Sequence, residues 1–229
     1  MPLLLLLVSP SMAATLTVGS TGSYSTIQSA VNAASSGDTI TIEAGTYSED
    51  VDTDGKNLTL IGAGSNKVTI DASGNDSALT VDQGETVRLE GVTLTGSAQG
   101  VNVVGSTLTA SDLDLYGMTG DSAGGGFLLS DGASVDVSDT LVRGIQVGNN
   151  AYGGAVFASD SSATFTDCVF KNNKSYQGGA FYLVNSILEL TDSSIWGNDS
   201  TLKGGGLQLR QGSDATLLRV AIYENSSDD

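Results

Sequence analysis

The 229-residue sequence contains no histidine, one cysteine, two prolines and only nine basic residues. Without histidine there is no imidazole for a catalytic triad, for a metal site or for the commonest general base. The single cysteine, Cys168, cannot form an internal disulfide, so packing must stabilise the fold. These absences exclude several large enzyme classes and the small disulfide-stapled domains.

Acidic residues greatly outnumber basic residues. Twenty-six acidic residues against nine basic residues give a formal net charge of -17, which repels nucleic-acid phosphates and anionic lipids. Nucleic acid is therefore not an expected partner. Solubility outside the cell explains the acidity more simply than calcium binding, with which it is also compatible. The 30 glycines and the 15% of charged residues indicate a folded, turn-rich β protein.

The first fourteen residues are similar to a secretory signal peptide. An apolar block, Leu3 to Val8, precedes small residues that end at Ala13 and Ala14, where we expect cleavage, although the usual positive amino-terminal region is missing. The block is too short to span a bilayer, and no other segment is a candidate. We predict a signal peptide over residues 1–14 and one domain over residues 15–229, in a secreted or cell-surface protein.

One helix is expected, over Thr26 to Ala34. Ser25 is the expected cap, with Gln28 three residues on, and Gly37 is the expected end. The apolar face has helical spacing and consists of Ile27, Ala30, Val31 and Ala34. From Asp38 onward, short β-branched runs alternate with Gly, Asn, Asp and Ser, which predicts many short strands.

Three markers repeat along the second half of the chain. Glycine doublets begin at Gly124, Gly153, Gly178 and Gly204, at intervals of 29, 25 and 26 residues. Asparagines that follow an apolar residue by three stand at Asn150, Asn173, Asn198 and Asn225, at intervals of 23, 25 and 27. Aspartates stand at Asp112, Asp139, Asp167 and Asp192, at intervals of 27, 28 and 25, and Arg219 takes the next place. Three markers thus share one period.

A period of this length, with several short strands and no helix, is that of one β-helix coil. We predict an all-β, right-handed parallel β-helix of about eight coils, with the helix as an amino-terminal cap. Equivalent residues of adjacent coils would then form columns with a repeat of about 4.8 Å. The expected inward residues are Ile40, Ile42, Leu58, Leu60, Phe165, Phe181, Leu183, Leu188, Leu190, Leu207 and Leu209. The last strand pattern runs to the end, so we expect a chain that continues beyond Asp229 or a partner stacked on the last coil.

Two segments resemble known families. The first comprises Tyr24 to Val31, Gly37 to Ile40, Ala44 to Tyr47 with Glu49, and Leu58 to Gly62. It resembles the opening segment of pectin-lyase-like β-helix proteins. That superfamily includes lyases, esterases, hydrolases and non-enzymatic surface proteins, so the resemblance implies the fold and leaves the activity open.

The second segment runs from about Gly124 to Asn225. Its pairing of Gly153-Gly154-Ala155-Val156 with Phe170-Lys171-Asn172-Asn173 resembles the paired repeats of the polymorphic outer membrane protein family. The resemblance implies display at the cell surface, at the outer membrane in that family. Two of the four glycine motifs depart from the pattern by carrying a third glycine. The membrane barrel that usually follows these repeats in that family is not found in this sequence, which leaves the anchoring route open.

The aspartate column is the main candidate for chemistry. Asp112, Asp139, Asp167 and Asp192 are calcium candidates, and Arg143, four residues after Asp139, would supply the base of a pectate lyase. Turn aspartates that accept backbone hydrogen bonds explain the column more simply. The catalytic pattern of pectin methylesterases is not found. Cys168 lies in an apolar strand context without basic neighbours, which indicates a buried, unreactive thiol.

Amide and aromatic side chains offer weaker candidates. The four repeated asparagines are expected to stack as amide ladders inside turns rather than to contact sugars. The expected exposed aromatic residues are Tyr116, Tyr152, Tyr176, Tyr182, Trp196 and Tyr223. They would form either a sugar-stacking strip or scattered packing contacts, and their irregular spacing favours the second.

The leading hypothesis is a secreted or cell-surface, non-catalytic β-helix that serves as a passenger, adhesin or structural element. The alternative is a carbohydrate-active enzyme, of polysaccharide lyase type, or a polysaccharide-binding module of the pectin-lyase-like superfamily. No cofactor is expected apart from the optional calcium. The expected partners are polysaccharides or other surface proteins.

Overall fold

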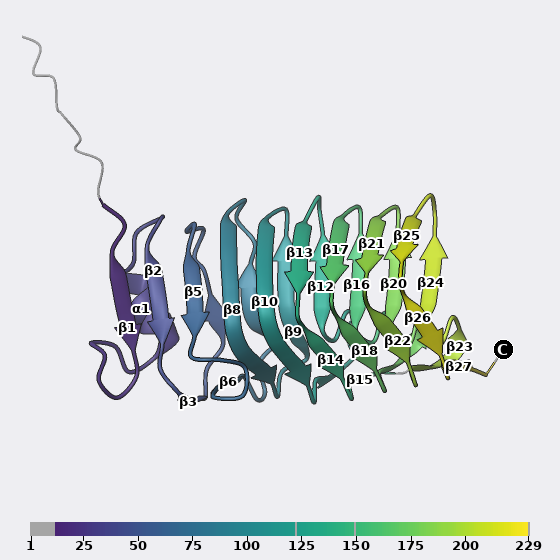
Figure 1. Cartoon of the computed structure of the whole chain (residues 1–229), viewed down its shortest axis with the longest axis horizontal. Helices are drawn as coiled ribbons and strands as arrows, with labels where there is room; N and C mark the ends of the chain where they lie inside the picture. Colours follow the sequence, from purple (N-terminus) through teal and green to yellow (C-terminus); the bar gives the residue numbers. More distant parts are fainter. Residues whose placement is uncertain (1–11, 122, 149, 229) are drawn as a thin grey trace, which may run out of the picture.

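The computed structural model describes residues 12–121, 123–148 and 150–228. Most of the predicted signal peptide therefore lies outside the described residues. The chain forms a parallel β-solenoid of about eight coils, stacked side by side along the long axis of the molecule (Figure 1). The predicted fold is confirmed.

The solenoid contains three parallel sheets, and every strand pairs with the equivalent strand one coil away. Sheets A and B extend along nearly the whole described chain, whereas sheet C begins only at Thr119. Sheet A follows the order β1 (Thr15–Val18), β2 (Thr39–Ile42), β5 (Thr59–Gly62), β8 (Thr86–Thr95), β10 (Thr107–Tyr116), β13 (Ser134–Ser138), β17 (Ser162–Thr166), β21 (Ile187–Thr191) and β25 (Asp214–Leu218). Its side branches are β3 (Gly45–Tyr47), β6 (Val68–Asp71), β14 (Leu141–Arg143), β18 (Val169–Lys171), β22 (Ser194–Trp196) and β26 (Ala221–Tyr223).

Sheets B and C close the coils. Sheet B contains β4 (Val51–Asp52), β7 (Ser77–Val81), β9 (Gln99–Val104), β12 (Phe127–Ser130), β16 (Val156–Ser159), β20 (Phe181–Val184) and β24 (Leu207–Arg210). Sheet C contains β11 (Thr119–Gly120), β15 (Gln146–Val147), β19 (Lys174–Gln177), β23 (Asp199–Lys203) and β27 (Ser226–Ser227). In sheet B, Phe127, Val156, Phe181 and Leu207 are successive partners, so the glycine doublets just before them lie in one row.

Alternate strand residues point inward and form one continuous core. Nine of the eleven predicted inward residues are buried. Four fully buried phenylalanines, Phe127, Phe165, Phe170 and Phe181, contact one another with ring centroids 4.5–5.9 Å apart. Leu207 is only half-buried and Leu209 is 39% exposed. Both pair in register with the buried residues Phe181 and Leu183, so they lie in the predicted inward columns, but they belong to the last described coil, where no further described coil covers them.

The helix α1 (Ile27–Ala33) begins one residue later than its expected start, Thr26. Thr26, not Ser25, is the N-cap, and its Oγ1 accepts a hydrogen bond from the Ser29 amide at 3.2 Å. The Glu49 carboxylate accepts from the Ile27 and Gln28 amides at 2.8 and 2.9 Å, which satisfies two further free donors of the first turn. The helix ends with a cap at Ala34, before Gly37.

Helix α1 covers the free edge of sheet B. The Gln28 side chain takes the hydrogen-bonding place of a neighbouring strand. Its Oε1 accepts from the Asp52 amide at 2.8 Å and its Nε2 donates to the Asp52 carbonyl at 3.1 Å. Lys56 Nζ donates to the Val31 carbonyl at 2.7 Å at the other end of the helix. The predicted amino-terminal cap is therefore confirmed, and the edge that it protects is that of β4.

An amide ladder lies inside the turn after β18 and β22. Asn198 is fully buried; its Nδ2 donates to the Phe170 carbonyl at 3.0 Å and to Asn225 Oδ1 at 2.9 Å. Its Oδ1 accepts from the backbone and side-chain nitrogens of Asn173, both at 3.0 Å. Asn150 is exposed and outside this ladder, because the Ile145 amide occupies the equivalent place and donates to Asn173 Oδ1.

We expect Asn198→Ala to lower the free energy of unfolding by about 1–3 kcal/mol, because the Asn173 amide and the Phe170 carbonyl of the preceding coil lose their partner. Asn150→Ala, at an exposed position, is the control and should change it by less than about 0.5 kcal/mol. Urea unfolding followed by circular dichroism measures both. Equal effects of the two substitutions would contradict a structural role for the ladder.

Candidate functional site

The four predicted metal-ligand aspartates do form one column. The residues that precede them, Ser111, Ser138, Thr166 and Thr191, are successive partners in sheet A. Asp112, Asp139, Asp167 and Asp192 all have left-handed backbones, with φ of 52°, 48°, 55° and 51°, and Arg219 follows at 55°. Asp139, Asp167, Asp192 and Arg219 each mark the corner between two successive strands of sheet A, and Asp112 lies at the equivalent place within the longer strand β10. Aspartate suits this corner because its short polar side chain tolerates the left-handed region.

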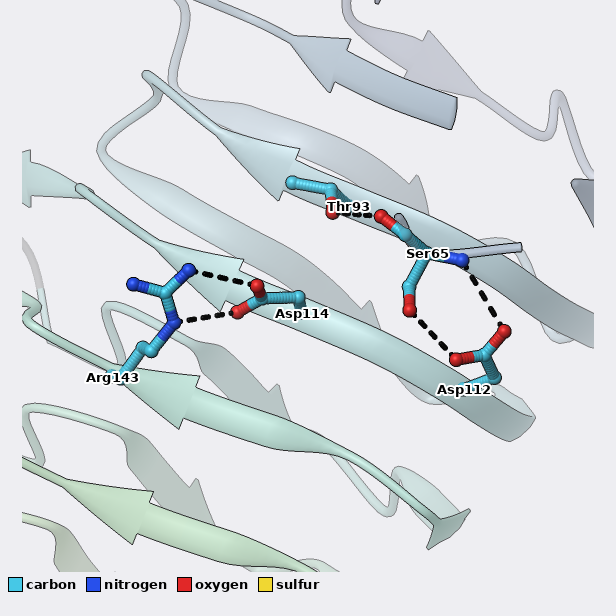
Figure 2. Close-up of polar contacts among 5 residues, drawn as sticks. All are labelled: Ser65, Thr93, Asp112, Asp114 and Arg143. Carbon is cyan, nitrogen blue, oxygen red and sulfur yellow. Dashed lines mark hydrogen bonds and ion pairs between the residues drawn. The ribbon is translucent and has the colours of Figure 1, made fainter. Parts of the chain in front are cut away.

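The side chains of the column do not converge on one point. Asp112 accepts hydrogen bonds from Ser65 Oγ at 2.7 Å and from the Ser65 amide at 3.2 Å, as Figure 2 shows. Asp192 pairs with Arg219, and the hydrogen bond from that guanidinium lowers the pKa of Asp192. Among the described residues, no group of three or more acidic, histidine or cysteine side chains is arranged to hold a metal ion. Calcium binding by the column stays a prediction, and this geometry gives it no support.

Arg143 is held by a partner that the sequence did not indicate. Its Nε and Nη2 donate to the two carboxylate oxygens of Asp114 at 3.0 and 2.8 Å (Figure 2). Its guanidinium also lies 4.5 Å from the centre of the Tyr116 ring. The hydrogen bond to Asp114 raises the pKa of Arg143 further. The Arg143 guanidinium would have to lose a proton before it could act as a base, and its ion pair with Asp114 opposes that loss. Arg143 is therefore poorly suited to act as the base of a lyase.

The aromatic residues are more ordered than their spacing suggested. Tyr116, Arg143, Lys171, Trp196 and Tyr223 are successive partners and form one outward column on sheet A. Lys171 Nζ lies 5.3 Å from the Trp196 ring, and Trp196 and Tyr223 stack with 5.9 Å between centroids at 5°. Because each ring covers its neighbour, this column stabilises the stack of coils and offers few free ring faces to a sugar.

A second aromatic group consists of Phe157 and Tyr182 on the outer face of sheet B, with Tyr152 and with Tyr176 of sheet C beside them. Phe157 and Tyr182 stack at 5.9 Å and 7°, Tyr152 lies 4.7 Å from Tyr182, and Tyr152 and Tyr176 are 6.1 Å apart. The expected packing role agrees with these ring contacts, although the rings gather in groups and are not scattered. Tyr182 is only 7% exposed, so the expectation that it is exposed was wrong. Phe157 was not among the expected surface aromatics, although its place between the buried residues Val156 and Ala158 marks it as outward.

The same outward column of sheet B becomes polar towards the amino-terminal end. Asp52, Thr80, Asn102, Leu128, Phe157 and Tyr182 are successive partners along it. Around Thr80 and Asn102 the surface is hollowed by about 510 Å³. We call this region the polar hollow; its lining residues are Asp50, Asn75, Asp76, Ser77, Thr80, Gln99 and Asn102. Among these described residues there is no lysine or arginine.

Hydrogen bonds hold most of the lining in place. Asn75 Nδ2 donates to Asp50 Oδ1 at 3.1 Å, and Ser77 Oγ donates to Gln99 Oε1 at 3.0 Å. Asn102 differs from these residues, because its Oδ1 is buried and accepts no hydrogen bond from the described residues. A buried acceptor without a donor is unfavourable by about 1–3 kcal/mol, so this atom favours a ligand that donates a hydrogen bond.

Cys168 lies in the core, 1% exposed, with Sγ 3.2 Å from the Thr166 carbonyl. Burial raises the pKa of its thiol to about 12. Since the thiolate is the nucleophile, the sequence-based prediction of an unreactive thiol agrees with this environment.

We expect the native protein to resist alkylation by iodoacetamide at pH 8, because about one thiol in ten thousand is ionised there if its pKa is about 12. The urea-unfolded chain should react at the rate of an ordinary cysteine. Mass spectrometry over time measures both rates. Rapid labelling of folded protein would show that Cys168 is accessible and ionisable.

The family model for the right-handed β-helix region matches residues 91–228. The chain belongs to the right-handed β-helix family. This β-helix chain is similar to carrot pectin methylesterase, with a TM-score of 0.58, 15% identity and coverage of 93% of this chain and 84% of that chain. It is also similar to the alginate lyase from Paenibacillus sp. str. FPU-7, with a TM-score of 0.52, 14% identity and coverage of 94% and 99%.

At these identities the likeness of the β-helix chain to both enzymes concerns the fold, and it agrees with the pectin-lyase-like resemblance of the opening segment. A comparison with curated proteins gives no match. No helix among the described residues is long and apolar enough to cross a membrane.

Proposed function

We propose that this β-helix is a non-catalytic protein, secreted or displayed at the cell surface, that binds polysaccharide through the outer face of sheet B. The observation that carries the proposal is the polar hollow, whose seven lining residues are all polar and include a buried acceptor without a donor, Asn102 Oδ1. Amide, hydroxyl and carboxylate groups together donate to and accept from sugar hydroxyls.

The absence of a matched catalytic set supports binding without turnover. The sequence has no histidine, the Cys168 thiol is buried, and Arg143 forms a bidentate ion pair with Asp114. In the polar hollow, Asp50 is hydrogen-bonded to Asn75. None of these groups is prepared to abstract a proton from a sugar ring.

Location outside the cell is supported by the sequence. Residues 1–14 are similar to a signal peptide, and the net charge of -17 favours solubility and disfavours nucleic acid. The repeats from about Gly124 to Asn225, similar to those of polymorphic outer membrane proteins, add support for surface display. Pectin methylesterase and alginate lyase, which share the fold, are named for polysaccharides, and this supports the same ligand class here.

Affinity electrophoresis through gels that contain single polysaccharides tests the binding. We expect at least one polysaccharide to retard the protein, Asn102→Ala to abolish the retardation, and Gln146→Ala, at an exposed position of sheet C, to leave it unchanged. A parallel assay follows the absorbance of unsaturated products from polygalacturonate and alginate with calcium. Sustained turnover that Arg143→Gln abolishes would overturn the non-catalytic assignment in favour of a lyase.

A further inference from the structure

We infer that the polar hollow selects an uncharged saccharide and discriminates against uronate polymers. The inference rests on the proposed function and specifies its ligand. It sets this chain apart from its structural neighbours, whose names refer to pectin and alginate.

The charges of the hollow argue against an acidic ligand. Two of its seven lining residues, Asp50 and Asp76, are carboxylates, and no lining residue is a cation. A uronate carboxylate bound here would be desolvated beside like charges without a lysine or arginine to pair with it. The long-range field of a protein with net charge -17 adds to that repulsion.

The hydrogen-bonding groups of the lining, like its charges, favour a neutral sugar over a uronate. The carboxylates of Asp50 and Asp76 only accept, and Asn102 Oδ1 is a third acceptor, buried and without a donor among the described residues. An ionised uronate carboxylate also only accepts, whereas each hydroxyl of a neutral sugar donates one hydrogen bond. The lining therefore presents carboxylate acceptors to sugar hydroxyls, beside amide and hydroxyl groups that both donate and accept.

The surface next to the hollow also favours a neutral saccharide. In the outward column of sheet B, Asn102 is followed by Leu128 and then Phe157, both half-buried. Each step along the column is about 4.8 Å, so a polymer that leaves the hollow along the solenoid axis passes over apolar surface. The apolar C–H face of a neutral sugar packs on such a surface, and a hydrated carboxylate does not.

Isothermal titration calorimetry with size-matched neutral gluco-oligosaccharides and galacturono-oligosaccharides tests the selectivity. We expect the wild type to bind the neutral ligand at least tenfold more tightly, with an affinity that does not change between low and high salt. Asn102→Ala should weaken neutral binding at least tenfold. Asp76→Asn should tighten galacturonate binding and so reduce the ratio of the neutral affinity to the galacturonate affinity. The control Gln146→Ala should change neither affinity.

The outcomes separate this inference from the proposed function. If galacturonate binds more tightly than the neutral ligand and Asn102→Ala abolishes its binding, the hollow is a saccharide site and the inferred selectivity is wrong. Binding only to a protonated amino-sugar polymer, lost at high salt, would also overturn the selectivity. If no saccharide binds and gels that contain polysaccharides do not retard the protein, the proposed function itself fails.

Discussion

Replacing Gly179 by alanine is expected to lower the free energy of unfolding by roughly 4 kcal/mol or more, among the largest effects of a single substitution. A Cβ at this position would lie 2.2 Å from the Gly205 carbonyl oxygen and 2.7 Å from that of Asp199. Both are backbone atoms of the next coil, fixed by strand pairing, so neither can move without separating coils.

Gly132→Ala is the matched control. Gly132 has a φ of +86°, and no atom lies within 4 Å of its added Cβ. Its substitution should therefore cost only the left-handed backbone strain, about 1–2 kcal/mol. Urea unfolding of both variants, followed by circular dichroism, measures the difference. If Gly179→Ala were no more destabilising than Gly132→Ala, the glycine row would not be a site of close coil-to-coil approach.

Phe170→Ala is expected to lower the free energy of unfolding by about 3–5 kcal/mol, because it leaves a cavity in the core. The Phe170 ring is fully buried, with its centroid 4.5 Å from that of Phe181 and 5.1 Å from that of Phe165. The double variant Phe170→Ala/Phe181→Ala should be less destabilised than the sum of the single variants, because the two rings share contacts.

Phe157→Ala, on the half-buried outer face of sheet B, serves as the comparison and should cost clearly less than Phe170→Ala. Guanidinium unfolding followed by far-ultraviolet circular dichroism gives all four free energies. A loss below about 1 kcal/mol for Phe170→Ala would mean that the coils repack without the ring, contrary to a tightly packed core.

The repeats made the fold predictable because residues one period apart in the sequence lie next to each other in adjacent coils. Gly153, Gly178 and Gly204 share a row because each has a left-handed backbone, with φ of 65°, 66° and 68°, where an added Cβ would also meet the carbonyl three residues further on. The second glycine of the doublet, as at Gly154 and Gly179, is the one that approaches the next coil. The aspartate column was found for the same reason. The aspartates serve the left-handed backbone of a corner, and a residue type alone does not distinguish that requirement from metal binding.

Side-chain partners were harder to predict than columns. Arg143 stands four residues after Asp139 in the sequence, yet its partner is Asp114, because Asp114 pairs with Leu141 in the register of β10 and β14. The polar hollow could not be found from the repeats at all. In the early coils the successive outward residues Asp52, Thr80 and Asn102 share no residue type, so only the strand register brings them together.

The alternation of inward and outward columns separates what holds the solenoid together from what it presents to its surroundings. The polar hollow lies on sheet B, whereas the Tyr116 to Tyr223 column lies on sheet A, and the inward phenylalanines contribute to neither surface. A descendant of this chain can therefore acquire a new ligand by exchanging a few outward side chains on one face, while the other faces and the interior retain their residues.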